Sequence, residues 1–171
     1  MHTSSDVQLS FDLDAAPAGL VYLPDFIDAA EERALVAALE GVAWQEVVMH
    51  GQAAKRTVAN ALVELLASRY PPGARIGWHR DAPMFGPTVA GLSLAGPCEL
   101  VLRHGDAERY TLALAPRSLY VLGGAARASW QHMIKPVPAL RYSLSFRTLK
   151  QSGAPASRRT TTPRTAPARR R

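Results

Sequence analysis

Early in the chain, apolar residues recur at helical spacing, and these stretches alternate with short apolar runs that predict strands. A run at 19–23 predicts a strand, and the next stretch, 29–39, has the spacing of an amphipathic helix. Asp28 precedes this stretch as an N-cap, with Glu31 three residues later as in a capping box. The pattern then predicts, in order, a strand at 44–49, a polar loop at 50–57 and a second helix at 59–69.

From residue 70 onward the pattern changes to short strands separated by proline and glycine. The expected strands are 74–79, 88–95, 98–103, 108–114, 118–123, 128–134 and 140–149. About seven short strands at a spacing of roughly ten residues are typical of a β-sandwich or barrel. We therefore expect an α+β, mainly β fold with the N-terminal helices packed on its outside.

The net charge of +6 comes from one end of the chain. Residues 151–171 hold six of the 20 basic side chains and no acid, which leaves 14 bases against 14 acids in residues 1–150. This arginine-rich tail lacks large apolar residues, and we expect it to be disordered. Two interpretations stay open: a salt-dependent affinity for phosphates, or a solubilising extension without a function of its own.

The remaining composition predicts a single domain over 19–150 behind a flexible leader, 1–18. Hydrophobic residues make up 47% of the chain, enough for a core, and no apolar run is long enough to cross a bilayer. Cys98 is the single cysteine, so an internal disulfide is excluded, and its apolar surroundings favour a buried side chain. We expect a monomeric cytoplasmic protein that does not bind membranes.

A histidine and an aspartate stand two residues apart at the end of the strand expected at 74–79. Side chains two apart on a strand point the same way, so His79 and Asp81 can reach one metal ion together. With five histidines and 14 acids in the chain, one such pair also arises by chance. Alone, the pair is better interpreted as two surface side chains joined by a hydrogen bond.

His132 adds a third candidate ligand, 51 residues beyond Asp81. A lone histidine in an apolar strand is more often a satisfied core residue than a ligand. Together with His79 and Asp81, however, it completes two imidazoles and one carboxylate on one side of a metal. This set is typical of iron(II) oxygenases, which leave the opposite positions open for co-substrate and dioxygen.

The last expected strand alternates strictly between polar and apolar side chains over residues 141–147. The ordinary interpretation is a half-buried strand whose polar face, with Arg141 and Arg147, lies in water. The alternative is that this face lines the inside of a barrel. Two arginines on one face suit a dicarboxylate such as 2-oxoglutarate, because guanidinium pairs with carboxylate through two parallel hydrogen bonds.

Four segments carry these motifs in order: 69–81, 118–127, 130–132 and 141–147. Together they resemble the metal- and co-substrate-binding regions of the AlkB-type dioxygenases. The resemblance covers residues 66–149 closely and 19–57 loosely. It implies a double-stranded β-helix (jelly-roll) core and iron(II)- and 2-oxoglutarate-dependent removal of alkyl groups from DNA or RNA bases, with release of an aldehyde.

The resemblance also implies a role for individual residues. His79, Asp81 and His132 would bind the iron. Arg141 would pair with the far carboxylate of 2-oxoglutarate. The residues that would make the other co-substrate contacts are Tyr70, Ser143 and Arg147. Relatives often carry asparagine where this chain has Ser68 and Ser143, so we expect altered co-substrate contacts here.

The chain departs further from the family between 58 and 68, where relatives carry a few dozen more residues of a substrate lid. Enzymes that act on a base hold it against apolar or aromatic surfaces. The nearest candidates to replace the lid are Trp130, Met84 and Phe85, although each taken singly is better interpreted as core packing.

Three functions stay open from the sequence. The favoured one is dealkylation of bases in single-stranded or duplex DNA, or in RNA, as in DNA repair. The second is the same oxygenase chemistry on a protein or a small molecule. The third is a non-catalytic relative that has lost its lid.

Overall fold

The computed structural model describes residues 16–49, 52–62 and 64–150. The tail at 151–171 and nearly all of the leader predicted at 1–18 lie outside these residues. The elements, in chain order, are β1 (Leu20–Leu23), α1 (Ala29–Glu40), β2 (Gln45–Met49), β3 (Gln52–Leu62), β4 (Leu65–Tyr70), β5 (Ile76–His79), β6 (Phe85–Leu94), β7 (Cys98–His104), β8 (Glu108–Leu114), β9 (Leu119–Leu122), α2 (Gly124–Ala128), β10 (Gln131–Ile134) and β11 (Arg141–Leu149).

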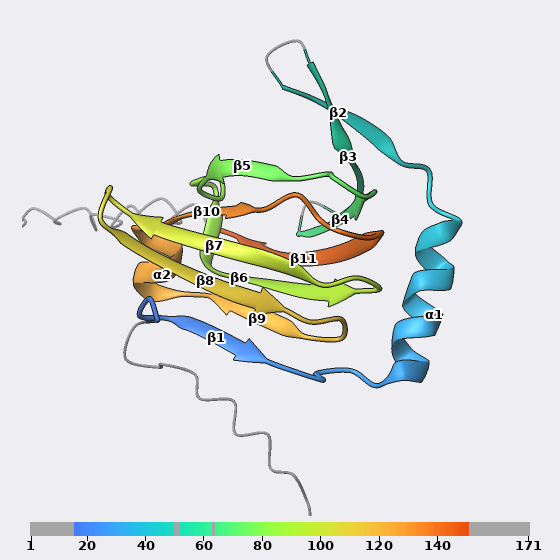
Figure 1. The fold of residues 1–171 in the computed structure, drawn as a ribbon, viewed down its shortest axis with the longest axis horizontal. Coiled ribbons are helices and arrows are strands. Elements are labelled where there is room, and N and C mark those ends of the chain that lie inside the picture. Colours follow the sequence, from blue (N-terminus) through green and yellow to red (C-terminus); the bar gives the residue numbers. More distant parts are fainter. Residues whose placement is uncertain (1–15, 50–51, 63, 151–171) are drawn as a thin grey trace, which may run out of the picture.

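Two antiparallel sheets form the body of the protein (Figure 1). The larger has seven strands in the order β1-β9-β6-β11-β4-β3-β2, and the smaller has four in the order β5-β10-β7-β8. In the runs β9-β6-β11-β4 and β5-β10-β7 the neighbouring strands are far apart in the sequence, as expected when a chain winds repeatedly between two facing sheets. The prediction of a mainly β fold is therefore confirmed.

The main core lies between the two sheets and is built from alternate residues of each strand. Leu100 and Leu102 of β7 lie beside Leu112 and Leu114 of β8 on the inner face of the smaller sheet, and all four are almost completely buried. Period-two alternation puts their neighbours in sequence on the outer face of the smaller sheet. Cys98 is buried in the same core, as its apolar surroundings indicated.

A second core packs α1 against the larger sheet. Leu39 of the helix lies in one apolar cluster with Ala67, Leu92 and Tyr142 from three strands. The helix begins with the predicted capping box, in which the Asp28 carboxylate accepts hydrogen bonds from the backbone of residues 30 and 31. No helix among the described residues has the length and apolar character needed to cross a membrane.

Two predictions for the region before residue 70 were wrong. The loop expected at 50–57 and the helix expected at 59–69 are the strands β3 and β4 wherever the structure describes them. Backbone pairing decides this, since β4 is enclosed between β3 and β11 and pairs with β11 from Leu65↔Phe146 to Tyr70↔Arg141. Such long-range pairing overrides local helix propensity.

The strand expected at 128–134 begins three residues late, at Gln131. The short helix α2, which the sequence pattern did not indicate, takes up residues 124–128. It starts directly after β9 and returns the chain to the smaller sheet. Figure 1 shows α2 beside the ends of the strands.

The strand β2 forms one edge of the larger sheet. Its pairing with β3 shifts register between Glu46 and Val48, and the Val48 side chain is exposed. Figure 1 shows β2 and β3 extending beyond the other strands. The ladder at this edge is therefore interrupted near its middle.

Gly91 of β6 lies against the ring of Tyr120 on the neighbouring strand, and a Cβ added at Gly91 would overlap that ring. Tyr120 is buried, so the ring has little room to move. We expect Gly91→Ala to lower the free energy of unfolding by about 1–3 kcal/mol, measured by urea denaturation. The matched control is Gly77→Ala, because no atom lies within 4 Å of a Cβ there; an equal loss in both variants would contradict the steric explanation.

Candidate metal centre and cavity

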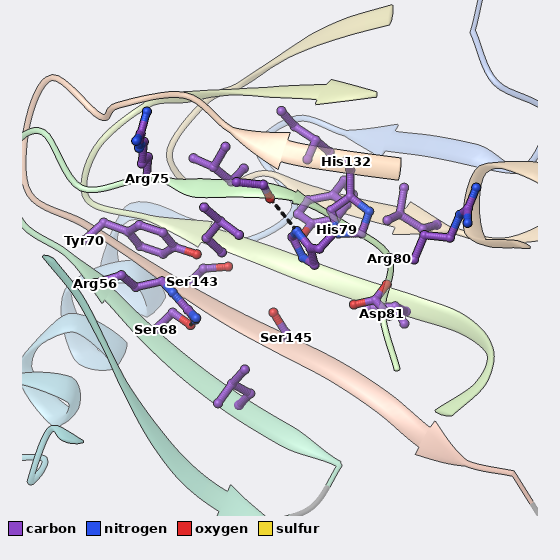
Figure 2. Close-up of a pocket in the computed structure, with 18 of the residues that line it drawn as sticks. Arg56, Ser68, Tyr70, Arg75, His79, Arg80, Asp81, His132, Ser143 and Ser145 are labelled. Carbon is purple, nitrogen blue, oxygen red and sulfur yellow. Dashed lines mark hydrogen bonds between the residues drawn. The ribbon is translucent and has the colours of Figure 1, made fainter. Parts of the chain in front are cut away.

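Three potential metal ligands meet between the sheets. His79 at the end of β5 and His132 in β10 are direct partners across the strands, and their ring centroids are 4.2 Å apart. Asp81 follows His79 by two residues, and one ligand atom from each of the three lies within 4.8 Å of the others. Figure 2 shows the three side chains gathered at one end of a cavity.

The imidazole of His79 is fixed in one tautomer. Its Nδ1–H donates to the Gly77 carbonyl oxygen at 2.9 Å, a contact visible as the dashed line in Figure 2. Because a carbonyl oxygen only accepts, Nδ1 carries the proton and Nε2 keeps a free lone pair. A backbone hydrogen bond of this kind is the usual way in which a metal-binding histidine is oriented.

His132 is held in its neutral form. Burial, reinforced by the nearby imidazole of His79, lowers the pKa of His132 to about 4. At neutral pH the ring therefore has a lone pair to offer a metal ion, which a protonated imidazole lacks.

Asp81 is partly buried, and its Oδ2 atom, which is buried, has no hydrogen-bond partner among the described residues. Arg127 of α2 approaches this oxygen with Nε at 3.8 Å, while its Nη2 donates to the Ala82 carbonyl. This distance allows ion pairing without a hydrogen bond. The donor set of two imidazoles and one carboxylate fits iron(II) with open positions opposite.

A cavity of about 370 Å³ extends from these three residues between the sheets. Its floor is the inner face of β11 and β4, so the polar side of the alternating segment 141–147 faces inward. The lining residues from this face are Leu66, Ser68, Tyr70, Arg141, Ser143, Ser145 and Arg147. The interpretation that the segment lines a barrel interior is the one that the fold supports.

Arg141 is a fully buried cation that forms no ion pair with any of the residues that the structure describes. Its side chain is 1% exposed, and Nη2 donates to Ser93 Oγ at 3.0 Å. The guanidinium lies 5.0 Å from the centre of the Tyr70 ring, but Nε and Nη1 have no partner in the described part of the chain. A buried charge left in this state is costly, and an anion bound beside it would remove that cost.

Arg147 lies nearer the metal end of the cavity. Its guanidinium stacks on the Phe85 ring at 4.0 Å, and Nε is buried without a partner within the described residues. Burial lowers the pKa of Arg147, while the charge of Asp81 acts in the opposite direction. Arg147 and Asp81 therefore influence each other through the same cavity.

The two serines that replace the family asparagines face each other. Ser68 and Ser143 are cross-strand partners and both are buried. Arg56 of β3 reaches over them, and its Nη1 donates to Ser68 Oγ at 3.2 Å (Figure 2). Sequence reasoning missed Arg56, because the uniformly polar stretch around it predicts a loop and only the β3–β4 pairing brings it to the cavity.

The three apolar candidates for substrate contact lie in different places. Phe85 lines the cavity beneath Arg147. Met84 is exposed and is not among the residues that line the cavity. Trp130 packs against the main core and stacks on His104 with ring centroids 5.7 Å apart. Of the three, only Phe85 is positioned beside the metal ligands.

Residues 43–159 match the family model of the 2OG-Fe(II) oxygenase superfamily. An Alkylated DNA repair protein ALKBH8 homolog from Arabidopsis thaliana is 28% identical over 68% of this chain and 50% of that protein. The chain thus spans about half the length of this curated relative.

Solved structures share the fold at low sequence identity. The structure of OsALKBH1 has a TM-score of 0.63 at 12% identity, covering 78% of this chain and 99% of that chain. A Pseudomonas putida prolyl-4-hydroxylase has a TM-score of 0.61 at 16% identity, covering 77% and 93%. The expectation of a double-stranded β-helix core is confirmed by this likeness.

Proposed function

The chain belongs to the 2OG-Fe(II) oxygenase superfamily, and we propose that it uses this chemistry to remove alkyl groups oxidatively from nucleic-acid bases. The similarity to an alkylated DNA repair protein homolog supports nucleic acid as the substrate. The observation that carries the proposal is the meeting of three metal-ligating side chains with a buried, anion-seeking arginine in one cavity.

In this proposal His79, Asp81 and His132 hold the iron. The Gly77 carbonyl keeps His79 Nε2 directed toward the ion, and burial keeps His132 neutral. Arg127, 3.8 Å from Asp81 Oδ2, favours a carboxylate that binds the metal through its other oxygen. The three ligands leave the cavity side of the metal free for co-substrate.

The co-substrate would lie along the inner face of β11. The unpaired Nε and Nη1 of Arg141 would bind the far carboxylate of 2-oxoglutarate, with the Tyr70 hydroxyl beside them. Arg147 and Ser143 would contact the part of the ligand nearer the metal. A buried guanidinium pairs strongly with a carboxylate because water does not compete for either group.

Bound iron(II) with 2-oxoglutarate and dioxygen supplies hydroxylation of a C–H bond, and the co-products are succinate and carbon dioxide. When the hydroxylated carbon is attached to a base nitrogen, the N–C bond breaks to give the free base and an aldehyde. The protein positions that carbon and keeps water out of the cavity. Phe85 is the aromatic side chain we propose beside the substrate.

A second candidate is the same oxygenase chemistry on a protein or a small molecule. The observation that favours it is the direct connection between β3 and β4, where the chain returns within three residues. This leaves no room there for the lid that holds an extruded base in relatives. Recognition of a base would then depend on the cavity itself and on the β2–β3 hairpin.

One experiment separates these functions. The protein is reconstituted anaerobically with iron(II) and 2-oxoglutarate, and succinate is measured after addition of air, with a methylated oligonucleotide, an unmodified oligonucleotide or neither. We expect the methylated strand to stimulate succinate formation with an equal yield of formaldehyde, and His79→Ala to abolish both. Succinate that is independent of the oligonucleotide favours the second candidate; no succinate under any condition rules out an oxygenase that acts on the tested strands.

A further inference from the structure

Three arginines converge on the cavity, and their partners are neutral. Arg141 donates to the Ser93 hydroxyl, Arg56 donates to the Ser68 hydroxyl, and Arg147 stacks on an aromatic ring. None of the three forms an ion pair with a carboxylate of the described residues. Their positive charges therefore remain available to interact with a ligand that enters the cavity.

Negative charge is scarce in the same space. Among the described residues that line the cavity, Asp81 is the only acid, whereas Arg75 and Arg80 add further positive charge at its rim. Asp81 is also engaged, because it belongs to the metal set and lies 3.8 Å from Arg127. No carboxylate is left in the cavity to stabilise a cation.

Binding of the co-substrate does not remove the excess of positive charge in the cavity. 2-Oxoglutarate carries two carboxylates, one for Arg141 and one for the metal end near Arg147. Arg56 comes from β3, on the far side of β4 from Arg141, and keeps an uncompensated charge. Figure 2 shows its guanidinium beside Ser68, on the inner face of the larger sheet.

Alkylated bases differ in charge in a way that this cavity distinguishes. Methylation at the pairing nitrogen leaves adenine and cytosine positively charged at neutral pH, but leaves thymine and uracil neutral. A positive charge of the protein about 10 Å from a cationic base repels it. At an effective dielectric constant of about 20, this repulsion lowers the affinity for the cationic base by roughly tenfold or more.

We propose that this cavity selects an uncharged alkylated base, of the N-alkylated thymine or uracil type, over a cationic one, and that Arg56 sets this preference. The inference rests on the proposed function and names the class of base on which it acts. Arg56 is the specificity-determining residue because, of the three arginines, it is the one that the proposed function does not use to hold the co-substrate.

The test uses two single-stranded oligonucleotides that differ at one base, N3-methylthymine or N3-methylcytosine. The methyl group occupies the same ring position in both, so charge is the main difference. Succinate formation gives the ratio of kcat/KM values, and fluorescence anisotropy with manganese(II) and 2-oxoglutarate under nitrogen gives affinities without turnover. We expect the methylthymine strand to be preferred by about tenfold in both measurements.

Variants at Arg56 identify the cause. Arg56→Gln is expected to bring the ratio close to one, Arg56→Glu to favour methylcytosine, and Arg56→Lys to retain the preference. The matched control Arg33→Gln removes an equal charge from the exposed face of α1 and should leave the ratio unchanged.

Each outcome bears on a different claim. Turnover of both strands at equal rates, or a preference for methylcytosine in the native protein, would overturn the inference and leave the proposed function standing. An Arg56→Gln variant that loses both strands equally would show a phosphate contact or a structural role instead of base selection. Failure of both methylated strands to raise succinate above the unmodified strand would overturn the proposed function, and this inference with it.

Discussion

Replacing His132 with alanine is expected to lower iron-dependent turnover of 2-oxoglutarate by more than about a hundredfold. The imidazole is buried, neutral and directly opposite His79, and within the described residues the candidate ligand group contains no fourth side chain to take its place. The measurements are iron(II) affinity under nitrogen and succinate formation in air. Loss of a metal-binding side chain should lower turnover more than loss of a residue that only orients such a side chain, for which the effect is about tenfold to hundredfold.

His104→Ala is the matched control for this change. His104 is also a histidine of the smaller sheet, but it is exposed and bonded to Glu108. We expect it to keep native turnover and iron affinity. If His132→Ala bound iron(II) as tightly as the native protein while remaining folded by circular dichroism, the metal assignment would be wrong.

Arg141→Met is expected to have opposite effects on co-substrate binding and on the stability of the ligand-free protein. Removing a buried cation that pairs with a carboxylate costs about 2–5 kcal/mol, so the KM for 2-oxoglutarate should rise by roughly thirtyfold or more. Without ligand, the same change removes an unpaired buried charge and should leave the free energy of unfolding unchanged or higher.

Both quantities are measured on one preparation, by succinate kinetics and by urea denaturation with and without 2-oxoglutarate. The control is Arg69→Met, one residue from the β4 partner of Arg141 and therefore on the opposite face of the sheet. It should change neither the KM nor the stabilisation by ligand. A native protein that gains no stability from 2-oxoglutarate, or an Arg141→Met variant with a native KM, would refute the role given to Arg141.

Local patterns in the sequence were sufficient for the elements that depend on local interactions. The capping box at Asp28 and Glu31 follows from the residues alone, because its hydrogen bonds join positions three apart. The strict alternation over 141–147 identified the polar face of β11 in the same way. Whether this polar face points into water or into the barrel interior could be inferred only from the family resemblance.

Features that depend on pairing between distant strands were not accessible from the pattern. The apolar spacing over 59–69 is compatible with a helix, and only enclosure between β3 and β11 makes residues 65–70 a strand. The same pairing delivers Arg56 to the cavity. The direct opposition of His79 and His132 likewise depends on the register of β5 and β10, which no local signal specifies.

The shift of register between β2 and β3 hinders the sheet from growing edge to edge into a second molecule. An open strand edge offers its free backbone groups as a template for another chain. Here β3 has three residues between its paired positions Thr57 and Ala53, whereas β2 has one between Glu46 and Val48, so the extra residues bend and twist the β2–β3 ribbon at that point. A straight strand arriving from another molecule cannot follow the whole of this bent edge, so self-association through it is disfavoured even though Val48 is apolar and exposed.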